Sequence, residues 1–425
     1  MDLISSWLGV THPVYLGVAL AAVVFGAYMA WTIGANDVAN AMATSVGSGT
    51  LTYRQAIVVA GVMEFAGAVL AGSHVTNTIR KGIVNVDLFQ QDPQILMIGM
   101  LAALLAAALW LHAATLLGLP VSTTHSIVGA VVGFALLVYG MNAVNWGKVM
   151  QIILSWVVSP VAGGAVSYVL FRWIRRWILA SEDPGRAMQI FAPFFAALTS
   201  FIIVLSAIYK GLKNVNLTLG GGTAVLLAAA VFVVVFLAVL LYVRSRGIET
   251  YRDLTNVERV FMVLQAITAA YVAFAHGAND VANAIGPVAA VIATAGQGIV
   301  ALKVQVPMWI LVMGGGGIVI GLATYGYKVI RTVGTKITEL TPTRGFAAEF
   351  AAATVVLAAS KAGLPISTTH TLVGSVLGVG LAQGIDAINL KVVRSVIASW
   401  LLTLPIAAGL AMILFFLLRA VIPVG

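Results

Sequence analysis

The sequence predicts an all-α polytopic membrane protein with about twelve transmembrane helices, built as two inverted-topology repeats with broken helices. Three observations support this fold class. The chain of 425 residues is 61% hydrophobic and 9% charged, whereas soluble domains carry about 25% charged residues. Apolar runs recur at the length that a bilayer-spanning helix requires. Two motifs also occur twice. The composition therefore excludes a soluble enzyme.

Two pairs of matching segments define an internal duplication. Gly34–Ala41 and Gly277–Ala284 both read GANDVANA, 243 residues apart. Leu119–Gly133 reads LPVSTTHSIVGAVVG and Leu364–Gly378 reads LPISTTHTLVGSVLG, 245 residues apart. Because the displacements nearly agree, each half is one copy of a duplicated unit. The predicted parts are a first transmembrane repeat at 1–171, cytoplasmic loops with a two-helix linker at 172–259, and a second, inverted repeat at 260–425.

Apolar runs give the expected membrane segments in order. The first repeat supplies five, at 14–34, 55–79, 94–117, 121–140 and 148–171. The linker supplies two, at 190–209 and 217–243. The second repeat supplies five more, at 260–279, 307–330, 346–360, 366–383 and 395–418. An odd number of spans followed by an even linker makes the second repeat enter from the opposite side, an arrangement typical of secondary transporters.

The distribution of Lys and Arg predicts the orientation. The clusters within Arg172–Arg186 and Arg244–Arg259 are separated by the two linker spans, so they share one side. Cytoplasmic loops are enriched in these residues, which places both termini outside in an integral plasma-membrane protein. The net charge of +9 is scattered between apolar segments, so no nucleic-acid partner is expected.

The two GANDVANA motifs each place a carboxylate inside an apolar segment. An ionised Asp at membrane depth costs about 2.5 to 3.5 kcal/mol and usually faces a partner or a water-filled path. Gly followed by Asn and Asp favours a helix break. Carboxylate, amide and freed backbone oxygens suit a hard cation such as Na+. The alternative is that these residues only cap broken helices. The predicted Na+ ligands are Asn36, Asp37, Asn40, Asn279, Asp280 and Asn283.

Consecutive hydroxyls follow a proline in each repeat, at Pro120–His125 and Pro365–His370, which we term the hydroxyl motifs. This pattern predicts helix N-termini, where N–H groups and the helix dipole favour an oxyanion. Two such termini from inverted halves can hold one small tetrahedral anion, although ordinary helix caps would give the same pattern. The predicted phosphate-binding residues are Ser122, Thr123, Thr124, Ser367, Thr368, Thr369, Asp37 and Asp280.

Further polar residues in apolar runs are candidates for coupling. Glu64 and Glu349 either couple cation to anion movement or form interhelical hydrogen bonds, and Gln265 is a weaker candidate. His125 and His370 are expected to pack or hydrogen-bond in the site, since no metal-ligand spacing accompanies them. The remaining candidates, with weaker claims, are His74, His112 and His276.

The duplicated GANDVANA and P-[VI]-S-T-T-H motifs resemble those of the inorganic phosphate transporter (PiT) family of cation-coupled phosphate symporters. The stretches Glu64–Gly67 and Thr78–Ile83, and Glu349 ahead of the second hydroxyl motif, are also similar to the family. The resemblance implies a twelve-helix inverted-repeat fold, often a homodimer, that couples Na+ or H+ entry to phosphate uptake. It also implies functional roles for Glu64 and Glu349.

We therefore predict a secondary active transporter and not an enzyme: a Na+-coupled phosphate symporter working by alternating access. Its partners would be phosphate, Na+ and the lipid bilayer, with no cofactor besides the co-transported Na+. The nearer alternative is an H+-coupled phosphate or sulfate permease of the same architecture. An intramembrane hydrolase is disfavoured, because a catalytic centre needs one nucleophile and one base and the motifs are duplicated. A passive anion channel is also disfavoured, because it would need basic residues along its pore.

Overall fold

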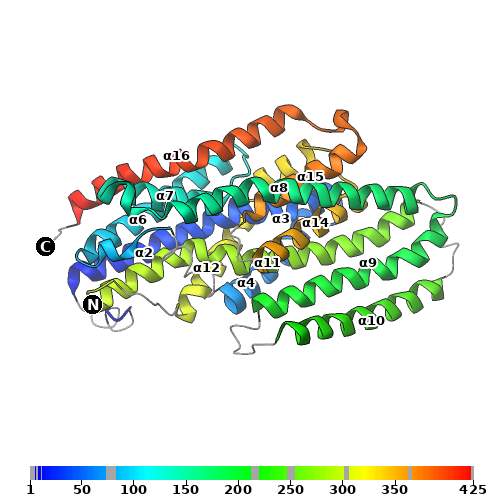
Figure 1. Cartoon of the computed structure of the whole chain (residues 1–425), viewed down its shortest axis with the longest axis horizontal. Coiled ribbons are helices and arrows are strands. Elements are labelled where there is room, and N and C mark those ends of the chain that lie inside the picture. The colour runs from blue at the N-terminus through cyan, green and yellow to red at the C-terminus, as the bar shows by residue number, and fades with distance from the viewer. Residues whose placement is uncertain are drawn as a thin grey trace.

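The structure, a computed structural model, describes residues 5, 8–10, 12–72, 83–211, 220–246, 254–300, 306–361 and 366–422. It is an elongated bundle whose long helices run roughly parallel (Figure 1). Within the described residues, ten helices are long and apolar enough to cross a membrane. The sole extended pairing in that part of the chain is the bridge between Val84 and Val144. The described part of each predicted apolar segment lies mainly on a helix, so the all-α membrane fold is confirmed, while segments 55–79 and 217–243 extend beyond the described residues.

The first repeat begins with α2, in which Pro13 occupies the first helical position, where its missing N–H costs nothing. The helix continues through a π-helical segment into α3, and α4 starts with a capping box formed by Thr52 and Gln55. The helices and their bounds are α2 Pro13–Ile33, η1 Gly34–Val38, α3 Ala39–Gly47, α4 Tyr53–Ala71, η3 Val86–Phe89, α6 Pro93–Leu116, α7 Thr123–Tyr139, η4 Gly140–Ala143, α8 Trp146–Ile174 and η5 Arg175–Leu179.

The linker helices α9 and α10 lead into the second repeat, which opens with the 44-residue helix α11. The predicted span 307–330 corresponds to α12 and α13 in succession. The bounds are α9 Pro184–Ser206, η6 Ala207–Gly211, α10 Gly221–Arg246, α11 Leu254–Gln297, α12 Met308–Tyr325, α13 Tyr327–Arg331, η9 Thr332–Lys336, α14 Pro342–Lys361, α15 Thr368–Gln383, η10 Ile385–Ala387 and α16 Leu390–Val421.

Helices α6 and α7 form a hairpin that begins and ends at one end of the molecule. Asn145 N donates to Ile83 O across the two ends of this hairpin, 2.9 Å apart. Gln94 at the start of α6 donates to the hydroxyl of Tyr15 near the start of α2. The tip of this first hairpin is the segment 117–122, which turns back towards the same end.

Helices α14 and α15 form a second hairpin, which opens towards the other end. Asn389 N donates to Ile337 O at 2.9 Å, closing its two ends. Thr343 N at the start of α14 donates to Glu258 near the start of α11. That end is opposite to the first, because α11 runs on until Gly296 packs near Gly9. The two hairpins therefore enter the bundle from opposite ends.

The two repeats are interlocked. Helix α8 of the first repeat packs most extensively on α15 of the second, and α16 of the second repeat packs on α7 and α6 of the first. Gly163 lies on Thr371 O, and Gly129 lies on Leu404 O. The predicted repeats are thus continuous in sequence, but each contributes its last helix to the hairpin of the other.

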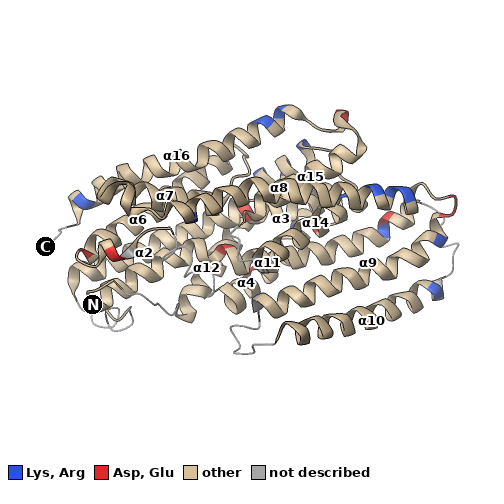
Figure 2. Ribbon diagram, viewed as in Figure 1, with Lys and Arg blue, Asp and Glu red and all other residues tan. Residues whose placement is uncertain are grey.

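Many Lys and Arg residues lie near helix ends, whereas several Asp and Glu residues lie in the middle of the bundle (Figure 2). The arginines at the end of α8 and at the start of α9 lie at one end, together with those at the end of α10 and the start of α11 (Figure 2). Helix α2 begins and α16 ends at the opposite end (Figure 1). The arginine clusters therefore share one end, as the charge pattern predicts.

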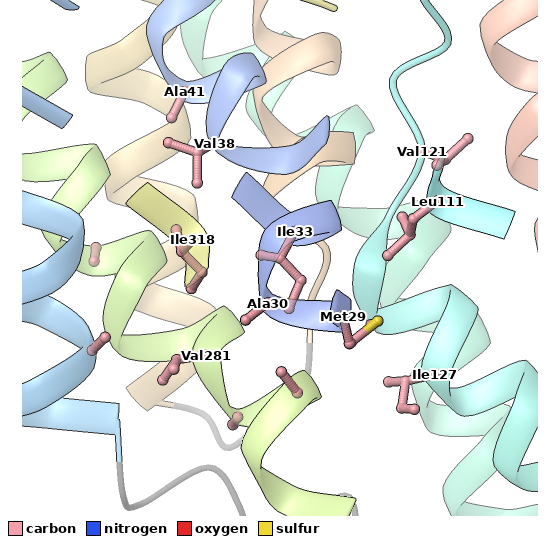
Figure 3. Close-up of a cluster of buried hydrophobic side chains, with 14 of the residues drawn as sticks. Met29, Ala30, Ile33, Val38, Ala41, Leu111, Val121, Ile127, Val281 and Ile318 are labelled. Carbon is pink, nitrogen blue, oxygen red and sulfur yellow. The ribbon is translucent and has the colours of Figure 1, made fainter. Parts of the chain in front are cut away.

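A buried apolar core surrounds the π-helical segment of the first GANDVANA motif. Ile33 and Val38, on either side of Asp37, have no exposed surface. Close packing of such side chains leaves little freedom for the polar residues between them. Figure 3 labels side chains of this core from several helices: Met29, Ala30, Ile33, Val38, Ala41, Leu111, Val121, Ile127, Val281 and Ile318.

Candidate functional site

Each hydroxyl motif starts a helix, as predicted. Ser122 is the N-cap of α7 and accepts a hydrogen bond from His125 N. Ser367 is the N-cap of α15 and accepts one from His370 N. The next residues therefore lie in the first turn, where unpaired N–H groups and hydroxyls are available to an acceptor.

Asp37 lies between the two hairpin tips, by which we mean the N-terminal turns of α7 and α15 together with the segment 117–122 that leads into α7. Its Oδ2 accepts hydrogen bonds from Thr123, from Oγ1 at 2.7 Å and from N at 3.4 Å. Its Oδ1 accepts a hydrogen bond from the hydroxyl of Thr369. The carboxylate is 2% exposed. One buried aspartate therefore joins the first turns of two helices that enter from opposite ends.

Asp280 repeats this arrangement. Its Oδ2 accepts a hydrogen bond from Thr368 Oγ1 at 3.2 Å, and its Oδ1 accepts from Asn279 and Asn283. Asn283 also donates to Thr123 Oγ1 at 3.0 Å. The two GANDVANA motifs and the two hydroxyl motifs thus meet in one cluster.

The asparagines of the two motifs differ in their contacts. Asn40 donates to Thr369 Oγ1 at 3.3 Å, and its own Oδ1 is buried without a hydrogen bond in the described structure. Asn283 donates to Thr124 Oγ1 as well as to Asp280. Asn283 thus contacts Asp280 directly, whereas Asn40 contacts Thr369, which donates to Asp37; their role as Na+ ligands stays a prediction.

Asn36 contacts the first hairpin tip instead. Its Nδ2 donates to Thr115 Oγ1 at 2.9 Å and to Leu119 O at 3.0 Å. Val121 N donates to its Oδ1 at 3.1 Å. The contacts with Leu119 and Val121 fix the backbone of the tip, so Asn36 holds the loop that positions Ser122. Its role as a Na+ ligand stays a prediction.

His276, which the sequence ranks low, lies at the centre of the cluster. Its Nε2 is 2.9 Å from Asp280 Oδ2 and 3.7 Å from Asp37 Oδ2. Its Nδ1 is 3.1 Å from the carboxylate of Glu64, which has no exposed surface. Ligand atoms of Asp37, His276 and Asp280 all lie within 4.8 Å of one another. The spacing of His276 four residues before Asp280, on one helix face, was the signal that could have identified it.

Glu349 occupies a second polar pocket. Its Oε1 accepts from Thr44 Oγ1 at 2.6 Å and from Ser45 Oγ at 2.7 Å. Gln265 Nε2 donates to the same oxygen, and Thr268 donates to Oε2 at 2.7 Å. The pocket gathers a buried carboxylate and several hydroxyl oxygens. Glu349 and Gln265, both coupling candidates, are thereby brought together.

His125 and His370 make aromatic contacts. The His125 ring stacks on Trp156 and the His370 ring stacks on Trp400, with centroids 3.3 and 3.7 Å apart. The two imidazoles meet edge to face at 4.3 Å. Trp400 also donates to Pro120 O at 2.9 Å. The rings therefore pack behind the hairpin tips, in keeping with a packing role.

The predicted helix breaks in the GANDVANA motifs are wrong. In the second motif α11 runs unbroken from Leu254 to Gln297. In the first motif the backbone widens into the π-helical segment Gly34–Val38 without leaving the helix. A single π turn often marks a functional site, because it exposes backbone groups without ending the helix.

The motif glycines serve helix crossing rather than a turn. A Cβ on Gly34 would overlap the carbonyl of Ile318, and one on Gly321 would overlap the carbonyl of Trp31. Helices α2 and α12 thus cross with their backbones in contact, which only glycine allows. This crossing lies three residues before Asp37 and fixes its position.

The second motif has the same crossing. A Cβ on Gly277 would overlap the carbonyl of Glu64, and one on Gly67 would overlap the carbonyl of Phe274. Helices α11 and α4 therefore cross three residues before Asp280. The first residue of each GANDVANA motif sets the depth of its aspartate in the bundle.

A small cavity borders the cluster between α3, α11, α14 and α15, with a volume of about 30 Å³. A water molecule needs roughly 10 to 15 Å³ of such space, so there is room for one or two water-sized species. The side chains that line it are mostly apolar. Residues 73–82 and 362–365, which include His74 and Pro365, lie outside the described part of the chain.

Comparisons with known proteins show which proteins the chain is similar to. A family profile described as "Phosphate transporter family" matches residues 33–411. A "Putative phosphate permease" of Pyrococcus furiosus is 49% identical over 398 residues, covering 94% of this chain and 95% of that protein. "Inorganic phosphate transporter 2-1, chloroplastic" of Arabidopsis thaliana is 44% identical, covering 97% of this chain and 76% of that protein. A solved structure, "The sodium-dependent phosphate transporter", is 46% identical with a TM-score of 0.87, covering 95% of this chain and 100% of that chain.

Proposed function

The chain belongs to the phosphate transporter family, and from that premise we propose that it couples Na+ entry to the uptake of inorganic phosphate by alternating access. The observation that carries the proposal is the meeting of both hairpin tips on Asp37, with Asp280 beside it. The likeness to a structure titled as a sodium-dependent phosphate transporter supports the choice of Na+.

Charge balance supports cation binding at the aspartates. Asp37, Asp280 and Glu64 are buried around a single imidazole, that of His276. One imidazolium can neutralise only one of three carboxylates, and an unpaired buried charge is costly. Na+ prefers carboxylate, amide and hydroxyl oxygens. The Asp37 and Asp280 oxygens, with the amides of Asn40 and Asn283, form such a donor set.

The hairpin tips supply donors for the anion. Thr123 and Thr368 begin α7 and α15, whose N-terminal N–H groups favour a negative group. The two tips approach from opposite ends and meet the same aspartate pair. A tetrahedral anion placed between them would accept hydrogen bonds from both repeats.

The hydrogen bonds of the threonines offer a route to coupling. A hydroxyl has one proton to donate, and Thr123 and Thr369 both donate theirs to Asp37. A cation on Asp37 would take up the lone pairs of the carboxylate and release these hydroxyls for phosphate. Cation and anion binding would then favour each other.

The pocket of Glu349 is a further candidate for a coupling cation. Its carboxylate is fully buried, and the hydroxyls of Thr44, Ser45 and Thr268 surround it. Hydroxyl groups can turn their lone pairs towards a cation as readily as they donate. We assign Gln265 to the same pocket as a ligand or as a support for Glu349.

The opposed hairpins support the proposal of alternating access. Movement of the first hairpin would open the aspartates to one end, and movement of the second would open them to the other. The arginine-rich end is assigned to the cytoplasm, because cytoplasmic loops are rich in arginine. Both termini are then outside, and the homodimer implied by the resemblance remains part of the proposal.

One observation favours H+ as the coupling ion instead. His276 bridges Asp280 and Glu64, an arrangement that can carry a proton between buried carboxylates. Under this reading the aspartates would bind no Na+, and the imidazole would load and unload the site.

Uptake of radiolabelled phosphate into proteoliposomes separates the two readings. With an inward Na+ gradient at equal pH, the proposal predicts accumulation above the external concentration. Replacing Na+ by choline should abolish it. Accumulation that follows a pH gradient alone, unchanged in choline, would contradict Na+ coupling.

A further inference from the structure

A cavity of about 190 Å³ lies between α8 and α14, apart from the aspartate cluster. Its walls are mainly apolar and include Leu154, Val158 and Ile366. Leu154 and Val158 are 56% and 60% exposed, so the cavity opens sideways on the face of the bundle. An engineered apolar cavity of about 150 Å³ in another protein binds benzene. The volume therefore suits one small planar molecule.

The cavity contains one unpaired polar group. Ser159 is 2% exposed and lines the cavity. Its Oγ forms no hydrogen bond with the described part of the chain. A buried hydroxyl without a partner is unfavourable. Gln151 and Ser155 also line the cavity, and Ser155 Oγ donates to Ile152 O. The site is thus mainly apolar, and within the described part of the chain Ser159 supplies its buried hydroxyl without a hydrogen bond.

The duplication shows which residues occupy the equivalent site between α16 and α6. Thr403 follows Ser159 by 244 residues, the displacement that also relates Trp156 to Trp400. Trp110 donates its indole N–H to Thr403 Oγ1 at 3.0 Å. On the α6 side, an indole therefore lies against the hydroxyl of α16.

The residue equivalent to Trp110 is small. Val355 follows Trp110 by 245 residues, the displacement of the hydroxyl motifs. Val355 lines the cavity beside Ser159. The α8–α14 pair thus keeps the hydroxyl, on α8 of the first repeat, but lacks the indole on α14 of the second repeat, and the missing ring coincides with the cavity.

We propose that this cavity binds a small planar aromatic molecule with one N–H or O–H donor, of the indole or phenol class. The ring would lie between α8 and α14 and its donor would reach Ser159 Oγ. The site is separate from the proposed phosphate and Na+ sites, so the proposal does not depend on them.

Binding of radiolabelled indole to the full chain in lipid nanodiscs tests the proposal, with empty nanodiscs as the control for partition into lipid. Equilibrium dialysis should show one saturable site per chain. Val355→Trp supplies the ring of the other repeat and should weaken indole binding at least tenfold. Val169→Trp adds a tryptophan on the same helix as Ser159 at a position that is 65% exposed, and should leave binding unchanged.

Indene provides a second readout, because it has the shape of indole without the donor. The wild-type chain should prefer indole by about two- to tenfold, the range expected for one hydrogen bond. Ser159→Ala should bind both compounds equally. Absence of saturable indole binding, as when a lipid chain fills the cavity, would overturn the proposal. Wild-type binding by Val355→Trp, or by Val355→Phe if the first variant misfolds, would overturn it as well.

Discussion

Replacing Asp37 by Asn removes one charge from the cluster without changing its shape. Thr123 and Thr369 donate to different oxygens of Asp37, so the amide oxygen can accept from one of them and the amide N–H can donate to the hydroxyl oxygen of the other. The variant no longer buries a carboxylate, so the lost charge-assisted hydrogen bonds are offset by the lower desolvation cost. We therefore expect Asp37→Asn to fold and to run as wild-type protein in size-exclusion chromatography.

The effect on Na+ should be large. Two unit charges about 4 Å apart attract each other by about 4 kcal/mol at an effective dielectric constant of about 20. Since about 1.4 kcal/mol corresponds to a tenfold change, the full loss would be nearly 10³-fold in Na+ affinity. Relaxation and the remaining Asp280 reduce this, so we expect a loss of about 10- to 10³-fold.

The loss is measured as a rise in the Na+ concentration that gives half-maximal phosphate uptake into proteoliposomes. Asp386→Asn makes the same chemical change at an exposed position of η10 and serves as the matched control. It should retain wild-type uptake. A wild-type Na+ dependence in folded Asp37→Asn would refute the assignment of Asp37 as a cation ligand.

Three further predictions follow from the same geometry. Thr123→Val and Thr369→Val should raise the KM for phosphate at least tenfold with a smaller effect on Na+ half-saturation, while exposed Thr335→Val should change neither; equal shifts for both ions would contradict anion binding by these hydroxyls. Gly321→Ala should destabilise the protein by about 1 to 3 kcal/mol, the usual cost of overpacking, because its Cβ meets the carbonyl of Trp31. Gly17→Ala has open space around its Cβ, so thermal unfolding should separate the two variants, and equal melting temperatures would remove the crossing argument. Arsenate should compete with phosphate uptake and sulfate should not, because only a protonated oxyanion can donate to an aspartate; effective competition by sulfate would contradict this filter.

The sequence predicted the fold class and the main residues of the cluster for local reasons. An apolar run of sufficient length has to be a helix in a bilayer, because its backbone must satisfy its own hydrogen bonds. Likewise, Pro followed by Ser and Thr favours a helix start, and the motifs cap helices at Ser122 and Ser367. Such rules need no knowledge of the neighbouring chain.

The role of the motif glycines could not be read locally. Gly34 and Gly277 have the sequence signature of a helix end, yet both allow contact with a second helix. Their partners, Ile318 and Glu64, are more than 200 positions away in the chain. Tertiary packing decides whether such a glycine forms a turn or a helix crossing, and composition and motif spacing do not show this packing.

The role of His276 also depends on tertiary contacts that the sequence does not show. The first repeat has Ile33 at the equivalent position, so comparison of the repeats gives this histidine no support. Its importance follows from contact with Glu64, which lies on another helix. Glu349 is also unmatched, since the residue 245 positions earlier is Leu104. The two repeats thus share the aspartates and hydroxyls but differ in the polar residues around them.

We expect cations on Asp37 and Asp280 to enable phosphate to bind at the hairpin tips, so the affinity for phosphate should differ between Na+ and choline. Isothermal titration of the purified chain measures both affinities at constant ionic strength and pH. Phosphate should bind at least tenfold tighter in Na+. By linkage, Na+ should bind tighter by the same factor in phosphate, and both effects should vanish in Asp37→Asn/Asp280→Asn. Equal phosphate affinity in Na+ and in choline would contradict cation-dependent phosphate binding at this site.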